Sequence, residues 1–178
     1  MFEQKDFSFI YKYFMAEKQA ALLFLIIGIV AIILAVIFIF FIKSDPSFYK
    51  GAAIPLLTIG LIQITVGYVV YTRTDKQKTE TAYHIGIEPV LYTKRVELPR
   101  MKTVMNRFVI YRWVEIVFLI IGLMLIYIFR LNADKSFWFG LGITLAIQAI
   151  IILGNDVFAE KRGLVYSKSL DKLGINIK

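Results

Sequence analysis

The sequence has no cysteine, one histidine and four prolines in 178 residues. Without cysteine the chain cannot form a disulfide, a thiolate metal site or a cysteine nucleophile. The one histidine, His84, has no second histidine or cysteine with which to share a metal ion, and no carboxylates are clustered at ligand spacing. We therefore expect a solvated loop histidine, no metal site and no cofactor.

The chain also lacks the short motifs of common enzymes. It contains no Gly-x-Ser-x-Gly, no His-Glu-x-x-His, no Walker A sequence and no acidic magnesium-binding motif. Because a membrane enzyme can build its site from scattered Glu, Arg and Tyr residues, these absences argue against catalysis without excluding it. The sequence favours a protein that is not an enzyme.

Charged residues make up only 19% of the chain, whereas 58% of its residues are hydrophobic and its mean hydropathy is +0.69. A soluble domain is apolar at about half of its positions or fewer, so the excess of hydrophobic residues here must face lipid. Most of these residues lie in four apolar runs without a charged residue, at residues 20–42, 51–72, 116–129 and 136–155.

Each run predicts a transmembrane helix, because about 20 apolar residues cross the hydrocarbon core of a bilayer. Residues 116–129 are short for a span and need Trp113 and Val114 at one end and a snorkelling Arg130 at the other. Four crossings predict an all-α integral membrane protein, built as a four-helix bundle of two antiparallel transmembrane hairpins.

Lysine and arginine are unequally distributed among the connections of these spans. Of the 21 cations, 17 lie before the first span, between the second and third, or after the fourth, and 4 lie in the two short hairpin connections. Since cytoplasmic connections are enriched in Lys and Arg, both termini are predicted to be cytoplasmic and the protein to lie in a cell's inner (cytoplasmic) membrane. The same bias accounts for the net charge of +8 without a nucleic-acid partner.

These features divide the chain into five regions. They are an interfacial helix (1–19), a first transmembrane hairpin (20–72), a basic helical connection (73–112), a second hairpin (113–155) and a C-terminal helix (156–178). Gly86 and Pro89 are expected to break the connection into two cytoplasmic helices, Pro99 to lie in the first turn of the second, and Gly174 to end the last helix.

The basic connection holds six cations between positions 94 and 112 against one acid, Glu97. The cations are Lys94, Arg95, Arg100, Lys102, Arg107 and Arg112. Beside a membrane such a segment binds anionic lipid headgroups and fixes topology. The alternative is that it binds an acidic protein partner.

A pentapeptide, Phe-Leu-Ile-Ile-Gly, occurs at residues 24–28 and again at 118–122. Each copy is preceded by Tyr-x-x-x-Glu and followed by Ser-Phe-aromatic-x-Gly, in the same order. Apolar segments also match by chance, so two interpretations stay open. If the halves are a duplication, each hairpin enters from the same side and the repeat is parallel.

Two amides stand at about the middle of their spans, Gln63 and Gln148, with Thr65 and Thr144 nearby. Polar groups at membrane depth are costly and are the first candidates for function. An amide that pairs across helices stabilises a bundle, and such bonds average under about 1 kcal/mol. The pair is either this kind of contact or part of a substrate or ion pathway.

Near the cytoplasmic end of the last two spans lie Glu115 and Asp156. Arg112 is three residues before Glu115, so the two share a helix face and are expected to pair. A Glu and an Asp at one membrane face can form a proton or cation site. An ion pair that flanks a span is the commoner arrangement.

The function that we expect is a non-catalytic membrane protein that binds another protein in or beside the bilayer. It would be an accessory subunit or an immunity-type protein that blocks a membrane-targeting toxin. The alternative is a small transporter or channel with a site where the hairpins meet. A homodimer is compatible with either, because four helices leave much surface facing lipid.

Overall fold

The computed structural model describes residues 8–175, and for residues 174 and 175 the backbone alone. Among these residues all regular structure is helical, so the prediction of an all-α chain is confirmed. The helices are α1 (Ser8–Phe40), α2 (Pro46–Ile87), α3 (Pro89–Tyr92), a π-helical turn η1 (Thr93–Glu97), α4 (Leu98–Phe129), a 3₁₀ turn η2 (Ala133–Lys135) and α5 (Ser136–Ile175).

Four of these helical stretches are long and apolar enough to cross a membrane, as the sequence predicts, which makes the chain a multi-pass membrane protein by length and composition. The longest, α2, has 42 residues, and at 1.5 Å per residue it is about 63 Å long. The hydrocarbon core is only about 30 Å thick. Roughly half of such a helix therefore has to lie outside the core.

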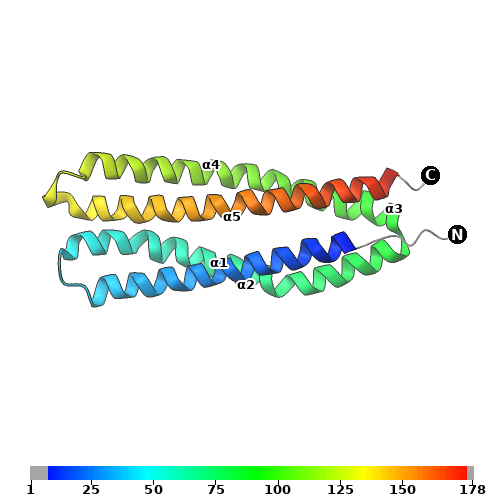
Figure 1. The fold of residues 1–178 in the computed structure, drawn as a ribbon, viewed down its shortest axis with the longest axis horizontal. Helices are drawn as coiled ribbons and strands as arrows, with labels where there is room; N and C mark the ends of the chain where they lie inside the picture. The colour runs from blue at the N-terminus through cyan, green and yellow to red at the C-terminus, as the bar shows by residue number, and fades with distance from the viewer. Residues whose placement is uncertain (1–7, 176–178) are drawn as a thin grey trace.

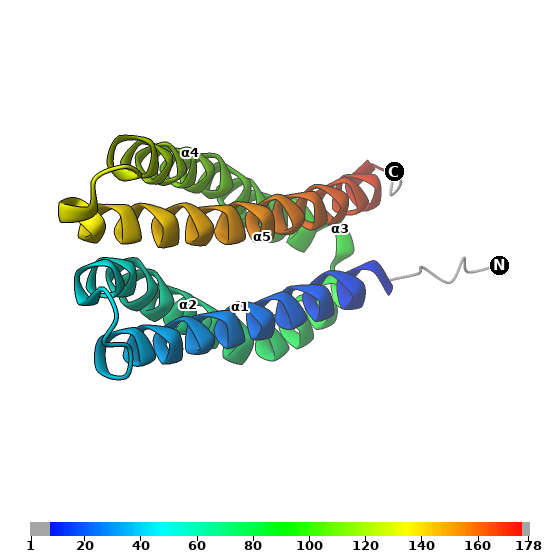
Figure 2. The same ribbon diagram turned by 60° about the vertical axis from the view of Figure 1, so that its left-hand side comes forward.

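The helices lie nearly parallel in one elongated body (Figure 1). Helix α1 lies beside α2, and α4 lies beside α5; both short connections are at one end, while the start of α1, α3 and the end of α5 are at the other. The two pairs form two layers (Figure 2), joined mainly where α5 packs against α2 and less where it meets α1. Helix α4 packs on α5 and is the least buried of the four long helices.

Asp45 caps the start of α2 and also joins the two layers. It has φ 42°, in the left-handed region that Asp tolerates better than most residues. Its Oδ1 accepts a hydrogen bond from the backbone N–H of Phe48 at 3.2 Å, which satisfies an orphan donor of the helix. The same atom accepts from the Ser136 hydroxyl at 2.9 Å, at the first residue of α5.

The ends of the helices differ in places from the sequence-based boundaries. Residues 8–19 of the predicted interfacial helix are the first turns of α1 and continue into the apolar run without a break, and residues 1–7 lie outside the described part of the chain. Helix α2 passes through Gly86, and the break falls at Glu88, because the residue before a proline disfavours helical geometry. Helix α5 continues past Gly174 to Ile175.

Pro99 lies in the first turn of α4, as expected, but α4 follows η1 without a break in a helical run that starts at Pro89. A proline inside a helix lacks the N–H that would bond the carbonyl four residues before, and its ring crowds that carbonyl. The preceding turn, η1, is widened to π-helical hydrogen bonding. This widening makes room for the ring without ending the helix.

Within the apolar runs the paired helices approach at glycine. A Cβ atom at Gly28 of α1 would lie 2.7 Å from the carbonyl oxygen of Gly60 on α2. A Cβ at Gly122 of α4 would lie 2.9 Å from the carbonyl oxygen of Gly142 on α5. Both first glycines end a copy of the repeated pentapeptide. Small residues let backbones approach where lipid gives no hydrophobic drive for helix association.

The largest cluster of buried apolar side chains lies outside the apolar runs, at the end of the molecule that holds both termini. Its members come from α1, α2, α4 and α5, and they are Ile10, Tyr13, Phe14, Ile85, Met101, Tyr166 and Leu170. Tyr13 and Phe14, which belong to the segment predicted as an interfacial helix, are thus buried in the protein. The polar extensions of the helices share a core like that of a soluble bundle.

Glycine packing gives a stability prediction. Gly28→Val should lower the free energy of unfolding by about 1–3 kcal/mol, because the added atoms overpack the contact with α2. Gly154→Val is the matched control, since a Cβ at Gly154 meets nothing within 4 Å. Both are measured by SDS titration of detergent-solubilised protein, followed by far-UV circular dichroism. Equal losses in the two variants would contradict the packing described here.

Candidate functional site

The two mid-span amides meet between the layers. Gln63 Nε2 on α2 donates a hydrogen bond of 3.2 Å to Gln148 Oε1 on α5. Both side chains are buried, at 0% and 2% exposure, and Gln63 Oε1 accepts no bond from any described residue. The amides are therefore shielded from solvent and bonded to each other.

The threonines near these amides behave differently from each other. Thr144 is buried one turn before Gln148, and its hydroxyl donates to the Gly140 carbonyl at 3.2 Å. Thr65 is exposed, and its hydroxyl donates to the Leu61 carbonyl of its own helix at 2.8 Å. Thr144 shares the face of α5 on which Gly140 and Gln148 meet α2, since the three are spaced i, i+4. Thr65 lies on the outer surface.

Glu115 and Asp156 are brought together between α4 and α5. Glu115 is 6% exposed, and its Oε2 has no hydrogen-bond partner among the described residues. Arg112 forms an ion pair with Glu160 on α5, not the predicted pair with Glu115. A long arginine side chain reaches away from the apolar region, and Glu160 lies one helical turn past Asp156 in that direction.

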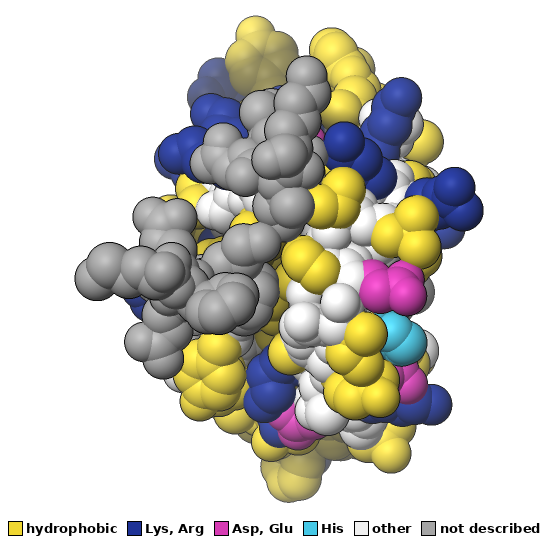
Figure 3. All heavy atoms as spheres, turned by 90° about the vertical axis from the view of Figure 1, so that its right-hand side faces the viewer, with side chains coloured by type: hydrophobic (Ala, Val, Ile, Leu, Met, Phe, Trp, Pro, Cys, Tyr) yellow, Lys and Arg dark blue, Asp and Glu magenta, His cyan; other side chains and the backbone are white. Residues whose placement is uncertain are grey.

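The six cations of the central connection fall into two sets. Arg100 and Arg112 are partly buried and ion-paired with Glu97 and Glu160. The other four are exposed and form no ion pair with any described residue; they are Lys94, Arg95, Lys102 and Arg107. We call these four the basic face. Figure 3 shows Lys and Arg side chains around the rim of this end of the molecule.

A buried ionic network lies beside the basic face. Glu97 is 1% exposed, and its two carboxylate oxygens accept from Arg100 Nη2 at 2.6 Å and Arg100 Nε at 2.9 Å. The Tyr166 hydroxyl of α5 donates to Glu97 Oε1 at 2.8 Å. Tyr13 of α1 stacks on Tyr166, with ring centroids 4.1 Å apart. The network thus connects α4, α5 and α1.

The protonation state of Tyr166 favours the hydrogen bond from its hydroxyl to Glu97. Burial, together with the negative charge of Glu97, raises the pKa of Tyr166 far above its ordinary value. The phenol therefore keeps its proton at physiological pH and acts as donor to the carboxylate. The bidentate Arg100 pair supplies the opposite charge that a buried carboxylate needs.

Sequence reasoning did not find this network. Glu97 was noted only as the one acid among the cations, and Tyr166 is 69 positions away from it. The available signal was the i, i+3 spacing of Glu97 and Arg100, and nothing in the sequence links that pair to Tyr13 or Tyr166.

His84 lies in the last turn of α2 and not in a loop, although it is exposed as expected. Its ring stacks on Tyr92 of α3 at 4.8 Å, with 11° between the planes. A cleft of about 340 Å³ opens here between the end of α2 and the α3–η1 segment. Within residues 8–175, no three His, Asp or Glu side chains are placed to hold a metal ion.

Comparisons of the chain with protein-family models, with curated proteins and with solved structures give no match. The function must therefore be inferred from the residues themselves.

The ionic network gives a second prediction. Tyr166→Phe should lower the free energy of unfolding by about 1–3 kcal/mol, because it removes a buried hydrogen bond to a charged group. Above a pH of about 10 Tyr166 loses its proton in the unfolded chain, where it is exposed, before it does so in the folded protein. The free energy of unfolding of the wild type should therefore fall as the pH rises, and it should fall less in Tyr166→Phe. Tyr111→Phe, at a 49% exposed tyrosine, is the control in the same SDS titrations. No difference between the two variants would contradict the network.

Proposed function

We propose that this chain is a non-catalytic, multi-pass protein of a cell's inner membrane that binds another protein through its cytoplasmic end. It serves as an accessory subunit or as an immunity-type protein that blocks a membrane-targeting toxin. The observation that carries the proposal is the basic face, four exposed cations that pair with no described residue and lie on helical segments outside the apolar runs.

The proposed topology has two antiparallel transmembrane hairpins, α1 with α2 and α4 with α5. The end with Ser8 and Ile175 is assigned to the cytoplasm, because 17 of 21 Lys and Arg residues belong to that side. The equivalent glycine contacts of Gly28 and Gly122 favour a parallel tandem repeat. So does a reciprocal contact between layers, where Gly51 packs on the Phe137 carbonyl and Gly140 on the Phe48 carbonyl.

Distance from the bilayer favours a protein over a lipid as the main partner. From Arg95 to Trp113, where the third span begins, the helix rises about 27 Å. The headgroup layer on each side is only about 5–8 Å deep. Arg107 and Arg112 are near enough to bind anionic headgroups, whereas Lys94, Arg95 and Lys102 extend beyond them. Exposed cations at that distance suit an acidic protein surface.

A transporter receives less support. Its site would need Gln63 and Gln148 to face a common water-filled cavity, and both amides are buried against each other. The apolar surface of α4 is largely exposed, and this leaves room in the membrane for lipid, for a membrane-embedded part of the partner or for a second copy of the chain.

The topology is tested by cysteine labelling, for which the chain is already cysteine-free. Lys94→Cys and Lys168→Cys should react with a membrane-impermeant maleimide only after the cells are permeabilised. Lys43→Cys and Asp134→Cys, in the two hairpin connections, should react in intact spheroplasts. The reverse pattern would overturn the assignment of the basic face to the cytoplasm.

Partner binding is tested by crosslinking in native membranes, with the full chain tagged at its C-terminus and the eluate quantified by mass spectrometry. The wild-type chain should recover one second protein in near-stoichiometric amount. Arg95→Glu with Lys102→Glu should reduce this recovery at least about tenfold, because like charges that face each other across an interface weaken binding.

Lys43→Glu with Lys135→Glu, at the opposite end of the molecule, is the matched control and should leave recovery unchanged. Cysteine labelling of the variants verifies that their topology is unaltered. Recovery of the chain alone, or of a partner equally with all variants, would contradict the proposal.

A further inference from the structure

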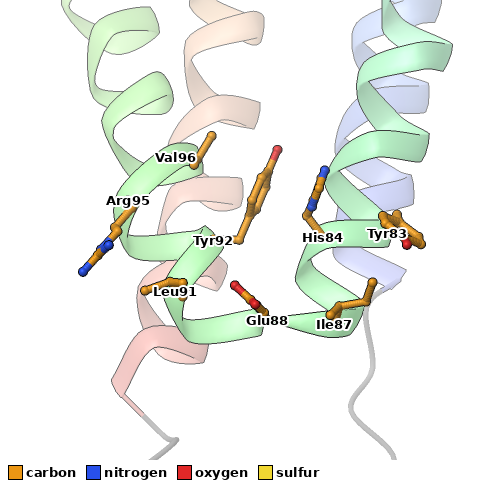
Figure 4. Close-up of a pocket in the computed structure, with 8 residues that line it drawn as sticks. All are labelled: Tyr83, His84, Ile87, Glu88, Leu91, Tyr92, Arg95 and Val96. Atoms are coloured by element: carbon orange, nitrogen blue, oxygen red, sulfur yellow. The ribbon is translucent and has the colours of Figure 1, made fainter.

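The cleft beside His84 lies between two helical segments, at the end of the molecule that is assigned to the cytoplasm. Figure 4 shows His84 of α2 and Tyr92 of α3 facing each other between the two arms, with Glu88 at the turn below them. Leu91 and Val96 line the α3–η1 arm, and Arg95 points outward from the same arm. A volume of about 340 Å³ is at the lower end of the range for ligand-binding pockets.

The apolar side chains around the cleft are exposed to solvent. Ile87 is 60% exposed, Leu91 46% and Val96 45%, and Tyr83 on the outer side of α2 is 63% exposed. From Thr72, the predicted end of the second span, to Ile87 the helix rises about 22 Å. Lipid covers exposed apolar residues in the spans, but it does not reach this far. Exposed apolar groups gathered outside a membrane mark a protein interaction site.

The charges near the cleft favour an acidic ligand. Lys94 and Arg95 are exposed and unpaired among the described residues, whereas Glu97 is buried and neutralised by Arg100. Glu88 is the one exposed acid among the lining residues. The outer rim of the α3–η1 arm is thus positive next to an apolar and aromatic surface.

The cleft is also preformed. The stacked rings of His84 and Tyr92 bridge its two arms, and the Glu88 N–H donates to the His84 carbonyl at 2.9 Å at the turn. Ile85 and Thr93, next in sequence to these rings, are each 0% exposed. Little conformational entropy is lost when a ligand binds a surface that is held in this way.

We propose that this cleft binds a short segment of a cytoplasmic protein in which an aromatic or aliphatic side chain is flanked by Asp or Glu. The apolar side chain packs among Ile87, Leu91 and Val96, and the acidic residues pair with Lys94 and Arg95. This inference rests on the proposed function, because it names the part of the chain through which the partner is recognised.

The test uses the single histidine as a reporter. The full chain, with a histidine-free tag, is labelled with isotopic histidine, reconstituted in nanodiscs of neutral lipid, and observed by NMR at the His84 ring. The probe is a synthetic peptide with one Trp flanked on each side by two acidic residues. Two matched peptides replace the Trp by Ser or the acidic residues by Lys.

The acidic Trp peptide should shift the His84 signals saturably, and the two matched peptides should not. Leu91→Ser and Arg95→Glu should each weaken binding at least about tenfold, as removal of an interface anchor or of its charge partner does. Lys135→Glu, the same kind of charge reversal in η2 at the opposite end of the molecule, should leave the affinity unchanged.

Three results would overturn the inference. They are the absence of a saturable shift, equal binding of the peptide that lacks Trp, and equal affinities in Leu91→Ser and the wild type. A His84 shift caused by anionic lipid in the nanodisc without any peptide would assign the cleft to lipid instead. If the membrane crosslinking recovers a partner whose binding Leu91→Ser does not alter, the proposed function stands and the cleft assignment fails.

Discussion

The contact of α2 with α5 is the interaction that joins the two helix pairs. It contains the Gln63 to Gln148 hydrogen bond, the close approach of Gly51 and Gly140 to backbone carbonyls, and the Asp45 to Ser136 hydrogen bond at one end. In lipid there is no hydrophobic drive between helices, so close packing and polar contacts must hold them together. The position of α5 on α2 in turn determines where Tyr166 lies.

The same long helices are stabilised differently in their two environments. In the apolar runs many contacts are made by small residues such as Ala31, Ala35 and Gly28, and most of the large apolar side chains face outward. At the other end, large side chains such as Phe14 and Leu170 are buried and charged residues are exposed. This reversal is what a helix needs when one half is solvated by lipid and the other by water.

The sequence was sufficient for the helical class and the four apolar runs, because the thickness of the bilayer fixes the length of a span. It left open whether Gln63 and Gln148 bond to each other or line a pathway, and the hydrogen bond between them agrees with the first interpretation. It was not sufficient for contacts in the water-exposed ends. There a helix can pack on several neighbours, so the partners of Tyr13 and Arg112 depend on how the long helices are aligned. The continuity of the helical run from Pro89 into α4 was also missed, since a widened turn such as η1 leaves no mark in the sequence.

The buried Glu97 network adds positional specificity more than stability. Desolvation of a carboxylate and a guanidinium offsets much of their attraction, so replacement by apolar residues often costs little. The bonds of Glu97 to Arg100 and Tyr166, however, are satisfied in one alignment of α4 with α5. The turn η1 that contains Glu97 also carries Lys94 and Arg95. The network thereby fixes the positions of Lys94 and Arg95 relative to the buried core. A surface that is held rigid in this way loses little conformational entropy when it binds a partner.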